Sequence, residues 1–378
     1  MRIALNATAI RPGVSGGLEA YALNLCAALG RRPDVAIVVF GVGEFCSRVR
    51  ELASDDIQCV RVRDAESGRF ARILWEQARL VEEVSATGAA LLHSLTHVSP
   101  LLPRAIPNVV TIPDLIAFRY PEHVGRAKRV YWGIGLPLAI DRASAVIAIS
   151  EFTRSEVCDL FPGACGKVHV TPLAVDGRLR RAAVEATPAS VDQPVDRHLL
   201  CVGGLGWHKN TDTLLRGLAL HRDLWGSAAT PRLVIVGRDY GAKADLRSNV
   251  EDLDLDSLVA FAGTVDFGEL DSLYRTSLAL VAVSHYEGFG FPVLEAMSYG
   301  IPVITTRGGA MAEVAGEAAW SVDGSDPRAI AAAIEFARSR GSAMQRKAEL
   351  GRARASMYTW DRTADETVRV YESLLGDT

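Results

Sequence analysis

Two carboxylates flank a glycine-rich segment in the second half of the chain. Glu287 and Glu295 are separated by the seven residues 288–294, Gly-Phe-Gly-Phe-Pro-Val-Leu. Residues 278–284 before them form a short apolar run, which is typical of a strand buried on both faces of a parallel sheet. Glu287 then leaves the carboxyl end of that strand, where ligands bind in open α/β sheets. The pattern therefore indicates the wall of a ligand pocket.

The segment between the glutamates favours close approach of the backbone to a ligand. Gly288 and Gly290 let the chain bend, and Pro292 suits the first turn of a helix that runs to Gly300. The free N–H groups of a helix start can bind hydroxyls or phosphate. The alternative is an ordinary strand–turn–helix, in which Glu295 complements the helix dipole and Glu287 is solvated.

Two other glycine-rich loops follow predicted strands. Residues 15–21 open a helix where a Rossmann-like fold has its phosphate-binding turn, although the full G-x-G-x-x-G spacing is absent. Residues 202–210 hold Gly203, Gly204 and Lys209 after the first strand of the second half. Each loop can instead be a tight turn, and Lys209 an ordinary surface lysine.

These segments resemble the retaining glycosyltransferases of family four, which have the two-domain GT-B architecture. The likeness extends to residues 261–265 and 269–274 before the glutamates, and to residues 300–304 after them. The resemblance covers nearly the whole chain and is densest from residue 199 to residue 305. It implies two doubly wound α/β Rossmann-like domains that face each other across a cleft.

The resemblance implies a role for each matching residue. Glu287 would lie against the donor sugar, Glu295 would hold the ribose hydroxyls, and Lys209 would meet the pyrophosphate. Glu287, Lys209 and Asp114 form the expected catalytic set. The expected donor-binding residues are Gly16, Gly17, Gly203, Gly204, His208, Arg238, Val265, Phe289, Gly290, Phe291, Leu294 and Glu295.

One departure from the family pattern concerns positive charge. Many members carry an arginine beside the loop lysine, where this chain has Gly203, Gly204 and His208. Charge compensation for the departing phosphate is therefore weaker here, or Arg238 contributes to it.

A second departure concerns proton transfer. Many members place a histidine before an aspartate at the end of a strand in the first domain, and this chain has Pro113 before Asp114. Proline can neither accept nor donate a proton. His93 and His97 follow a neighbouring strand and could substitute, although ordinary loop histidines are the favoured interpretation.

The resemblance implies retaining transfer of a mannose- or rhamnose-like hexose from a nucleotide sugar to a glycan or lipid-linked acceptor, in bacterial surface polysaccharide synthesis. Stabilising the leaving diphosphate is then the main electrostatic task. A GT-B-type sugar-nucleotide epimerase is one alternative. A catalytically silent nucleotide-sugar-binding homologue is another, and Pro113 and the missing loop arginine are its best support.

Composition limits the partners and the compartment. The net charge of −4 argues against nucleic acid, and no run of 18 or more apolar residues is present to span a bilayer. The first residues are too short an apolar run for a signal peptide. We expect a cytoplasmic protein whose membrane contact, if any, is peripheral at the inner face. Its six cysteines show no C-x-x-C pair, which favours reduced thiols.

One acidic motif could bind a metal ion. Asp252, Asp254 and Asp256 form D-x-D patterns, whose carboxylates suit Mg²⁺ or Mn²⁺. A solvated acidic loop is the commoner case. We therefore expect no metal and no cofactor, with the nucleotide sugar as a substrate.

The chain length and the strand–helix alternation predict two domains. Strands are expected near residues 2–6, 35–40, 89–93, 109–112, 145–149 and 168–172, and again from residue 199 to residue 305, with helices at 17–29 and 72–84. The expected boundaries are 1–176 for the acceptor-side domain, 177–197 for a linker, and 198–357 for the nucleotide-sugar domain. Residues 358–378 are expected to form a helix that crosses back to the first domain.

Overall fold

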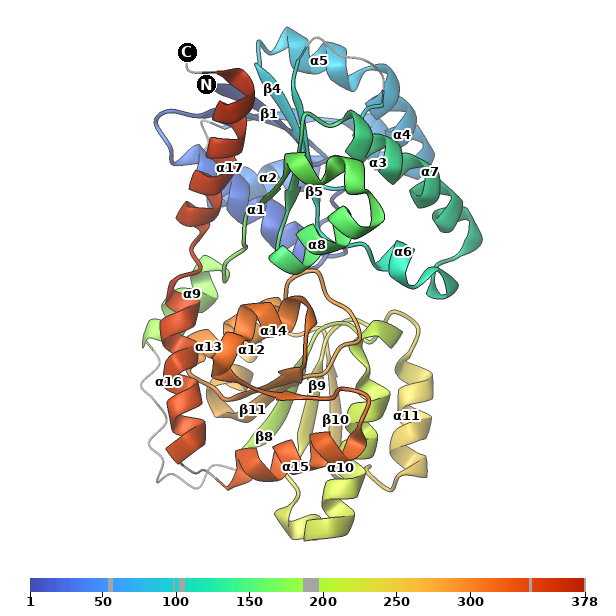
Figure 1. Cartoon of the computed structure of the whole chain (residues 1–378), viewed down its shortest axis with the longest axis vertical. Coiled ribbons are helices and arrows are strands. Elements are labelled where there is room, and N and C mark those ends of the chain that lie inside the picture. Colours follow the sequence, from blue (N-terminus) through green and yellow to red (C-terminus); the bar gives the residue numbers. More distant parts are fainter. Residues whose placement is uncertain (54–56, 98, 102–105, 186–196, 340–341, 377–378) are drawn as a thin grey trace. The chain divides into compact units, whose positions relative to one another are not determined.

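The computed structural model describes residues 1–53, 57–97, 99–101, 106–185, 197–339 and 342–376. The chain divides into two compact units. Unit 1 comprises Met1–Leu173 and Thr359–Thr378, and unit 2 comprises Ala174–Tyr358. Each unit is a parallel sheet with helices on both faces (Figure 1). This architecture confirms the predicted doubly wound α/β class.

The sheet of unit 1 has the strand order β3-β2-β1-β4-β5-β6-β7, with every neighbouring pair parallel. Its inner strands are apolar on both faces, so they are stable only when helices cover both sides. The strands are β1 (Arg2–Asn6), β2 (Ala36–Gly41), β3 (Gln58–Arg61), β4 (Leu91–Ser94), β5 (Asn108–Ile112), β6 (Ala145–Ala148) and β7 (Val168–Val170).

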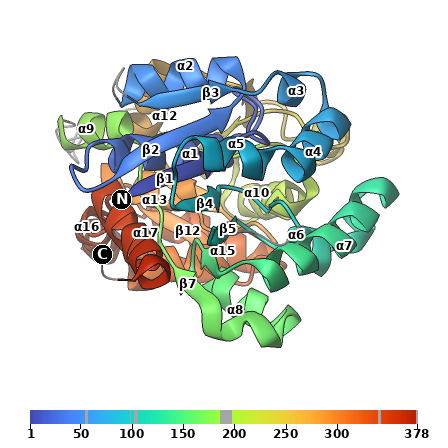
Figure 2. The ribbon, with the colours of Figure 1, turned by 90° about the horizontal axis from the view of Figure 1, so that it is seen from above.

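Eight helices of the described part of unit 1 connect these strands, and a ninth follows from the far end of the chain. They are α1 (Gly17–Gly30), α2 (Gly43–Leu52), α3 (Arg63–Glu66), α4 (Arg69–Ala78), α5 (Leu80–Ala86), α6 (Ile116–Arg119), α7 (Arg126–Arg142), α8 (Glu151–Leu160) and α17 (Trp360–Leu375), with short 3₁₀ turns η1 (Pro121–His123) and η2 (Pro162–Lys167). Helix α17 packs against α1 (Figures 1 and 2).

The sheet of unit 2 has the strand order β10-β9-β8-β11-β12-β13, again with parallel neighbours. All six residues of β11 are buried, as expected for the central apolar run. The strands are β8 (His198–Val202), β9 (Leu233–Val236), β10 (Val259–Gly263), β11 (Ser277–Ala282), β12 (Val303–Thr306) and β13 (Ala319–Val322).

The described part of unit 2 has eight helices, and those at residues 211–225, 243–252 and 327–338 form an apolar core with this sheet. The eight helices are α9 (Gly177–Glu185), α10 (Thr211–Trp225), α11 (Lys243–Asp252), α12 (Phe267–Thr276), α13 (Phe291–Tyr299), α14 (Gly309–Ala315), α15 (Pro327–Arg338) and α16 (Ser342–Ser356), with 3₁₀ turns η3 (Trp207–Lys209), η4 (Ser227–Ala229) and η5 (Gly316–Ala318). Helix α13 begins at Phe291 with Pro292 in its first turn, as predicted.

Three local expectations were wrong. The helix expected over residues 72–84 is two helices, α4 and α5, because Arg79 between them has a φ of −123° and ends the first. The first nine residues of the expected linker form α9, in which Leu179 and Ala183 are buried four residues apart. Arginines at other positions of this helix interrupt its apolar period, so the sequence did not indicate a helix here. Residues 186–196 of the expected linker lie outside the described residues.

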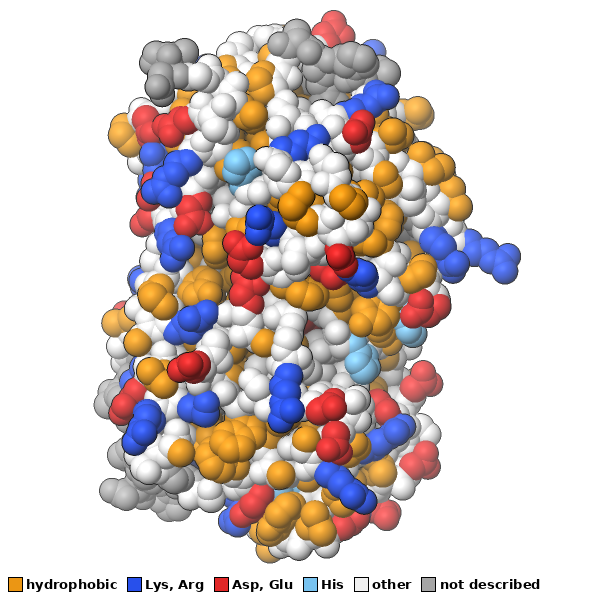
Figure 3. Space-filling view, in the orientation of Figure 1, with side chains coloured by type: hydrophobic (Ala, Val, Ile, Leu, Met, Phe, Trp, Pro, Cys, Tyr) orange, Lys and Arg blue, Asp and Glu red, His pale blue; other side chains and the backbone are white. Residues whose placement is uncertain are grey.

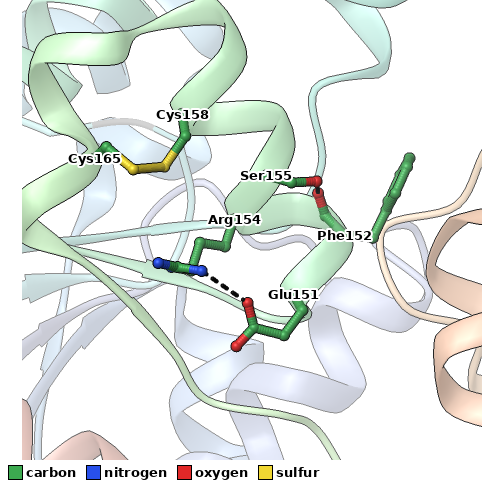
Figure 4. Close-up of a disulfide and its surroundings, with 6 residues drawn as sticks. All are labelled: Glu151, Phe152, Arg154, Ser155, Cys158 and Cys165. Carbon is green, nitrogen blue, oxygen red and sulfur yellow. Dashed lines mark hydrogen bonds and ion pairs between the residues drawn. A yellow bond between two sulfur atoms is a disulfide. The ribbon is translucent and has the colours of Figure 1, made fainter.

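The third correction concerns the thiols. Cys158 and Cys165 form a disulfide between α8 and the turn η2 (Figure 4). The chain reverses after α8, which brings the two Cα atoms to 4.8 Å, a separation that suits a disulfide. Two cysteines seven residues apart do not form a C-x-x-C pair, so the sequence pattern did not indicate this bridge. Cys26, Cys46, Cys59 and Cys201 are free thiols.

Candidate active site

The centre of the site in unit 2 is an ion pair between Lys209 and Glu287. Lys209 follows β8 and Glu287 follows β11, and these parallel strands are neighbours, so both residues leave the same edge of the sheet. Lys209 Nζ lies 2.5 Å from Glu287 Oε1, and Ser284 Oγ donates to the same oxygen at 3.0 Å. About a fifth of each charged side chain remains exposed, 17 % for Lys209 and 20 % for Glu287.

The electrostatics of this pair keep Glu287 ionised. Burial alone would raise the pKa of Glu287, but the charge and hydrogen bond of Lys209 outweigh burial and hold that pKa below its ordinary value. His208 and the Ser284 hydrogen bond act in the same direction. The site therefore presents an ionised carboxylate beside Lys209.

The loop before Lys209 needs its glycines for steric reasons. Gly203 has a φ of 139°, and a Cβ there would lie 2.8 Å from Lys209 Nζ. A Cβ on Gly204 would lie 2.0 Å from the ring of Tyr240. A Cβ on Gly237, at the end of β9, would lie 1.9 Å from the Gly203 carbonyl oxygen. A side chain at Gly203 would displace Lys209, one at Gly204 would displace the Tyr240 ring, and one at Gly237 would displace the loop backbone.

Asn210 anchors the same loop to two distant segments. Its backbone is left-handed, with a φ of 56°, and its side-chain amide donates to the carbonyls of Val283 and Gly324 at 3.0 and 2.7 Å. The His285 N–H donates to the His208 carbonyl at 2.7 Å, and the His285 ring stacks on Trp207. These contacts fix the position of Lys209 relative to Glu287.

Glu295 lies on α13 and has a different environment. The hydroxyl of Tyr274, whose side chain is fully buried, donates to Glu295 Oε2 at 2.6 Å. Burial raises the pKa of Glu295 to about 7, the Tyr274 hydrogen bond opposes that rise, and the charge of Asp176 adds to it. Tyr274 in turn stacks on Tyr299. The Tyr274 hydrogen bond therefore fixes the position of Glu295, and the carboxyl group of Glu295 titrates near neutral pH.

The start of α13 presents backbone groups. Gly290 precedes it with a φ of 117°, and in this described segment no side chain caps the helix. Phe289 is buried against Phe291 and Tyr358, so any ligand contact at Phe289 is through its backbone. Leu294 does not fit its expected role, because its side chain is fully buried and its N–H donates to the Gly290 carbonyl.

Arg238 and Val265 lie at the ends of neighbouring strands. Arg238 follows β9, is exposed, and accepts a backbone hydrogen bond from Leu205 at its carbonyl. Val265 follows β10 and is half-buried, directly before the Asp266 cap of α12. Both therefore leave the same sheet edge as Lys209 and Glu287.

In unit 1, the residues that were predicted to belong to the site lie in tight turns. Gly16 has a φ of 52° and precedes α1, which starts at Gly17. The loop is closed by Glu19, which accepts from the Gly13 N–H at 2.7 Å and pairs with Arg48. The carboxylate of Asp114 accepts from the Ile116 N–H at 3.1 Å, at the start of α6.

The two histidines considered as substitutes lie in different environments. His93 is fully buried, and its ring nitrogens lie 2.6 Å from the Tyr371 hydroxyl and 2.7 Å from Thr111 Oγ1. Burial lowers its pKa to about 3, so it stays neutral and structural. His97 Nε2 lies 2.7 Å from the Asp114 carbonyl oxygen, and its ring meets the edge of Trp132.

The acidic motif is an exposed turn. Asp252 ends α11, Asp254 has a φ of 51°, and Asp256 precedes β10; all three side chains are exposed. Arg222 donates to the carbonyls of Leu253 and Asp254. Among the described residues, no group of three or more His, Cys, Asp and Glu side chains is arranged to hold a metal ion. None of the helices in the described ranges has the length and apolar character needed to cross a membrane.

Comparison with known families covers both units. Residues 15–178 match the model of Glycosyltransferase Family 4, and residues 188–354 match that of Glycosyl transferases group 1. The protein is a family-4 glycosyltransferase. Its fold is GT-B: a glycosyltransferase from Rickettsia africae superimposes with a TM-score of 0.74 at 16 % identity, covering 100 % of this chain and 99 % of the other.

Two bacterial relatives resemble this glycosyltransferase over part of its length. O-antigen chain mannosyltransferase B of Escherichia coli is 28 % identical over 271 residues, which is 70 % of each chain. O-antigen chain mannosyltransferase RfbU of Salmonella typhimurium is 26 % identical over 239 residues, 63 % of this chain and 62 % of that one. The match to RfbU thus spans less than two thirds of that relative.

Three side chains of this glycosyltransferase's site had no predicted role. Ser284 donates a hydrogen bond to Glu287, and Tyr274 donates one to Glu295. Asn210, in the loop that carries Lys209, donates to the carbonyls of Val283 and Gly324. Asn210 carried a usable signal, because asparagine before a helix is a common cap and tolerates left-handed backbone. Tyr274 lies 21 residues from Glu295, and no local pattern joins the two.

Proposed function

We propose that this glycosyltransferase transfers a mannose-type hexose, with retention, from a nucleotide sugar to a glycan or lipid-linked acceptor in bacterial surface polysaccharide synthesis. The ion pair of Lys209 and Glu287 at the carboxyl edge of the unit 2 sheet is the observation that carries this proposal. The names of the two O-antigen mannosyltransferases support the choice of mannose and of a polysaccharide product.

The leaving diphosphate is the group that Lys209 serves. In the free protein, Lys209 is neutralised by Glu287. A bound diphosphate offers the ammonium group a second anion, whose charge grows as the bond to the anomeric carbon breaks. A fixed donor aimed at such developing charge typically contributes about 2.7–4 kcal/mol to catalysis. Because Lys209 supplies positive charge at this point, we expect activity to survive treatment with a metal chelator.

Glu287 then faces the sugar. Once Lys209 turns to the diphosphate, the Glu287 carboxylate keeps its hydrogen bond from Ser284 and can orient the sugar hydroxyls. It also supports the positive charge that develops at the anomeric carbon. The acceptor hydroxyl forms the new C–O bond on the face that the diphosphate leaves, and its proton passes to the departing phosphate oxygen. No separate general base is required.

Glu295 holds the nucleotide ribose. Tyr274 occupies Oε2, so Oε1 remains to accept from a ribose hydroxyl. Two hydroxyl donors favour the ionised form of the carboxyl, so nucleotide binding should lower the pKa of Glu295 from about 7. The N–H groups at the start of α13 are suited to phosphate or sugar oxygens.

A panel of nucleotide sugars tests the proposal. A donor at 100 times its dissociation constant adds about 2.7 kcal/mol to the free energy of unfolding, which a thermal-shift assay detects. Proton NMR of the product formed from that donor then gives the anomeric configuration. Inversion would overturn the retaining mechanism, and no stabilisation by any nucleotide sugar would overturn the donor class.

A silent binding protein is the second candidate, because Pro113 stands before Asp114 in unit 1. Calorimetric binding of the same nucleotide sugar beside a hydrolysis assay separates the two candidates. Binding without turnover, with glycan acceptors present, would favour the silent form.

A further inference from the structure

Two free thiols of unit 1 lie against each other beside the edge strand of its sheet. Cys46 is on α2, and Cys59 is on β3, which ends the strand order next to β2. The Cys46 thiol donates a hydrogen bond to the Cys59 sulfur. Cys59 Sγ also lies 3.8 Å from the Cys46 carbonyl oxygen, and Cys46 Sγ lies 3.9 Å from the carbonyl oxygen of Val60. Figure 2 shows α2 running along β3.

The two thiols of this pair differ in their access to solvent and in their acidity. The Cys46 side chain is buried, whereas Cys59 is half-buried. The hydrogen bond from Cys46 and the charge of Arg50 lower the pKa of Cys59 against the effect of burial. The same thiol contact and burial raise the pKa of Cys46. Because the thiolate is the nucleophile, Cys59 is the reactive member of the pair, and Cys46 is placed to attack it in a second step.

The other two free thiols have different surroundings. Cys26 is fully buried, and burial raises the pKa of its thiol. Cys201 on β8 is half-buried, and burial raises the pKa of its thiol to about 11. Lys and Arg side chains are interspersed with Asp and Glu side chains over the face that Figure 3 shows. We therefore attribute the difference between the thiols to their immediate neighbours. A half-buried thiol of lowered pKa beside a second cysteine is the arrangement of redox-active pairs.

We propose that Cys46 and Cys59 are a redox modification site, which a small-molecule disulfide such as oxidised glutathione converts into an intramolecular disulfide. The Cys59 thiolate attacks one sulfur of the reagent, so a mixed disulfide forms and one glutathione leaves as a thiolate. Cys46 then gives its proton to solvent and attacks the Cys59 sulfur, and the second glutathione leaves. The two protein thiols are oxidised by two electrons, and glutathione disulfide is reduced to two thiols.

The new bond would fasten the edge strand of the unit 1 sheet to α2. The two sulfurs must close to about 2 Å to bond. Because β3 ends the strand order, its partner strand β2 lies on one side only, and β3 is therefore the strand that can shift toward the helix. The same helix carries Arg48, whose ion pair with Glu19 helps to close the turn before α1. The thiol chemistry does not depend on the transfer reaction.

Peptide mapping of the oxidised protein tests this site. The full chain is incubated with oxidised glutathione, the remaining thiols are alkylated, and tryptic peptides are identified by mass spectrometry. Trypsin cleaves after Arg48 and Arg50, so the two cysteines fall in separate peptides that only the new bond joins. We expect the joined peptide to form and to disappear on addition of dithiothreitol. Cys59 should react at least tenfold faster than Cys201 in the same sample, because more of it is thiolate at neutral pH.

Two single substitutions separate the roles of the two thiols. In Cys46→Ser, the mixed disulfide at Cys59 should accumulate, because no second thiol displaces the glutathione. In Cys59→Ser, Cys46 should react at least tenfold more slowly than Cys59 does in the first variant. Cys201→Ser is the matched control and should form the joined peptide at the wild-type rate. Urea unfolding curves show whether each variant folds, and the comparison of Cys59 with Cys201 in the wild type needs no variant.

Four outcomes would overturn the inference. The first is a wild-type chain that forms no joined peptide, and the second is a bridge that forms only in urea. The third is reaction of Cys59 and Cys201 at equal rates. The fourth is a Cys46 thiol in Cys59→Ser that reacts as fast as Cys59 does in Cys46→Ser.

Discussion

The two units hold their candidate residues in different ways. In unit 2, Lys209 and Glu287 form a partly exposed pair whose members can each exchange the other for a ligand. In unit 1, His93 is buried with both ring nitrogens bonded, and the Asp114 carboxylate closes a turn. Unit 2 therefore carries charged groups that can bind a ligand, whereas His93 and Asp114 of unit 1 make structural hydrogen bonds.

The largest effect should come from Lys209. We expect Lys209→Ala to lower kcat about 10²–10³-fold with a smaller change in donor affinity, because charge on the leaving group grows toward the transition state. Steady-state kinetics with the identified donor measure both quantities. Lys243→Ala, on α11 of the same unit, is the matched control. A raised KM with unchanged kcat would contradict this role.

Removing the charge of Glu287 should have the next largest effect. Glu287→Gln keeps the shape, and we expect a tenfold to hundredfold loss of kcat, in line with about 1.5–3 kcal/mol for a charged hydrogen bond. Full activity would indicate that Glu287 is a solvated carboxylate with no role in transfer.

We also expect Glu287→Gln to change how the stability of the fold depends on pH in the acidic range. The pKa of Glu287 is held below its ordinary value of 4.5 in the folded protein. Its pairing therefore stabilises the fold above pH 4.5, and that contribution is lost as pH falls through the lowered pKa. Urea unfolding across this range should show a shallower loss of stability in Glu287→Gln than in the wild type.

The third test concerns Tyr274 and Glu295. Glu295→Ala should weaken binding of the free nucleoside diphosphate by about 1–3 kcal/mol, because ribose hydroxyls lose their acceptor. With a pKa of about 7, the carboxyl ionises near neutrality, so wild-type affinity should rise as pH passes 7. Tyr274→Phe removes a hydrogen bond that favours the carboxylate, so this midpoint should move to higher pH.

Calorimetry at several pH values separates these roles. Glu295→Gln should remove the pH dependence. The raised pKa of Glu295 also costs stability in the unliganded protein as pH rises toward and through 7. If the midpoint of the pH dependence of nucleotide affinity is unchanged in Tyr274→Phe, Tyr274 contributes only packing.

The smallest effects should come from unit 1. We expect Pro113→His and His97→Ala each to change kcat less than tenfold, with Pro113→Ala as the control for loop rigidity. His97 contacts a backbone carbonyl and an aromatic edge, which are structural partners. A 10²–10⁴-fold loss of kcat in His97→Ala would instead identify His97 as a proton-transfer group. Unit 1 would then also supply a catalytic group. A gain in Pro113→His would indicate a weakened family member.

Much of the fold was predictable because its signals are local. The all-buried run of β11, the bend at Gly290 and the start of α13 are each set by neighbouring residues. Helix α9 was overlooked because arginines interrupt its apolar period, and the disulfide because Cys158 and Cys165 meet only after a chain reversal. The assignment of Leu294 does not fit because the face of a helix that meets the core depends on packing.

The order of residues alone shows which groups are present and at which edge of a sheet they must emerge. Glycine-rich loops after buried strands place Lys209 and Glu287 at carboxyl ends, whatever the strand order. The packing of the sheet makes β8 and β11 neighbours, so two residues 78 positions apart share a hydrogen bond. It also placed the buried Tyr274 against Glu295 and moved the pKa of that carboxyl toward neutrality. The physical reason is that burial and long-range pairing depend on how all strands and helices pack, which no short stretch of residues specifies.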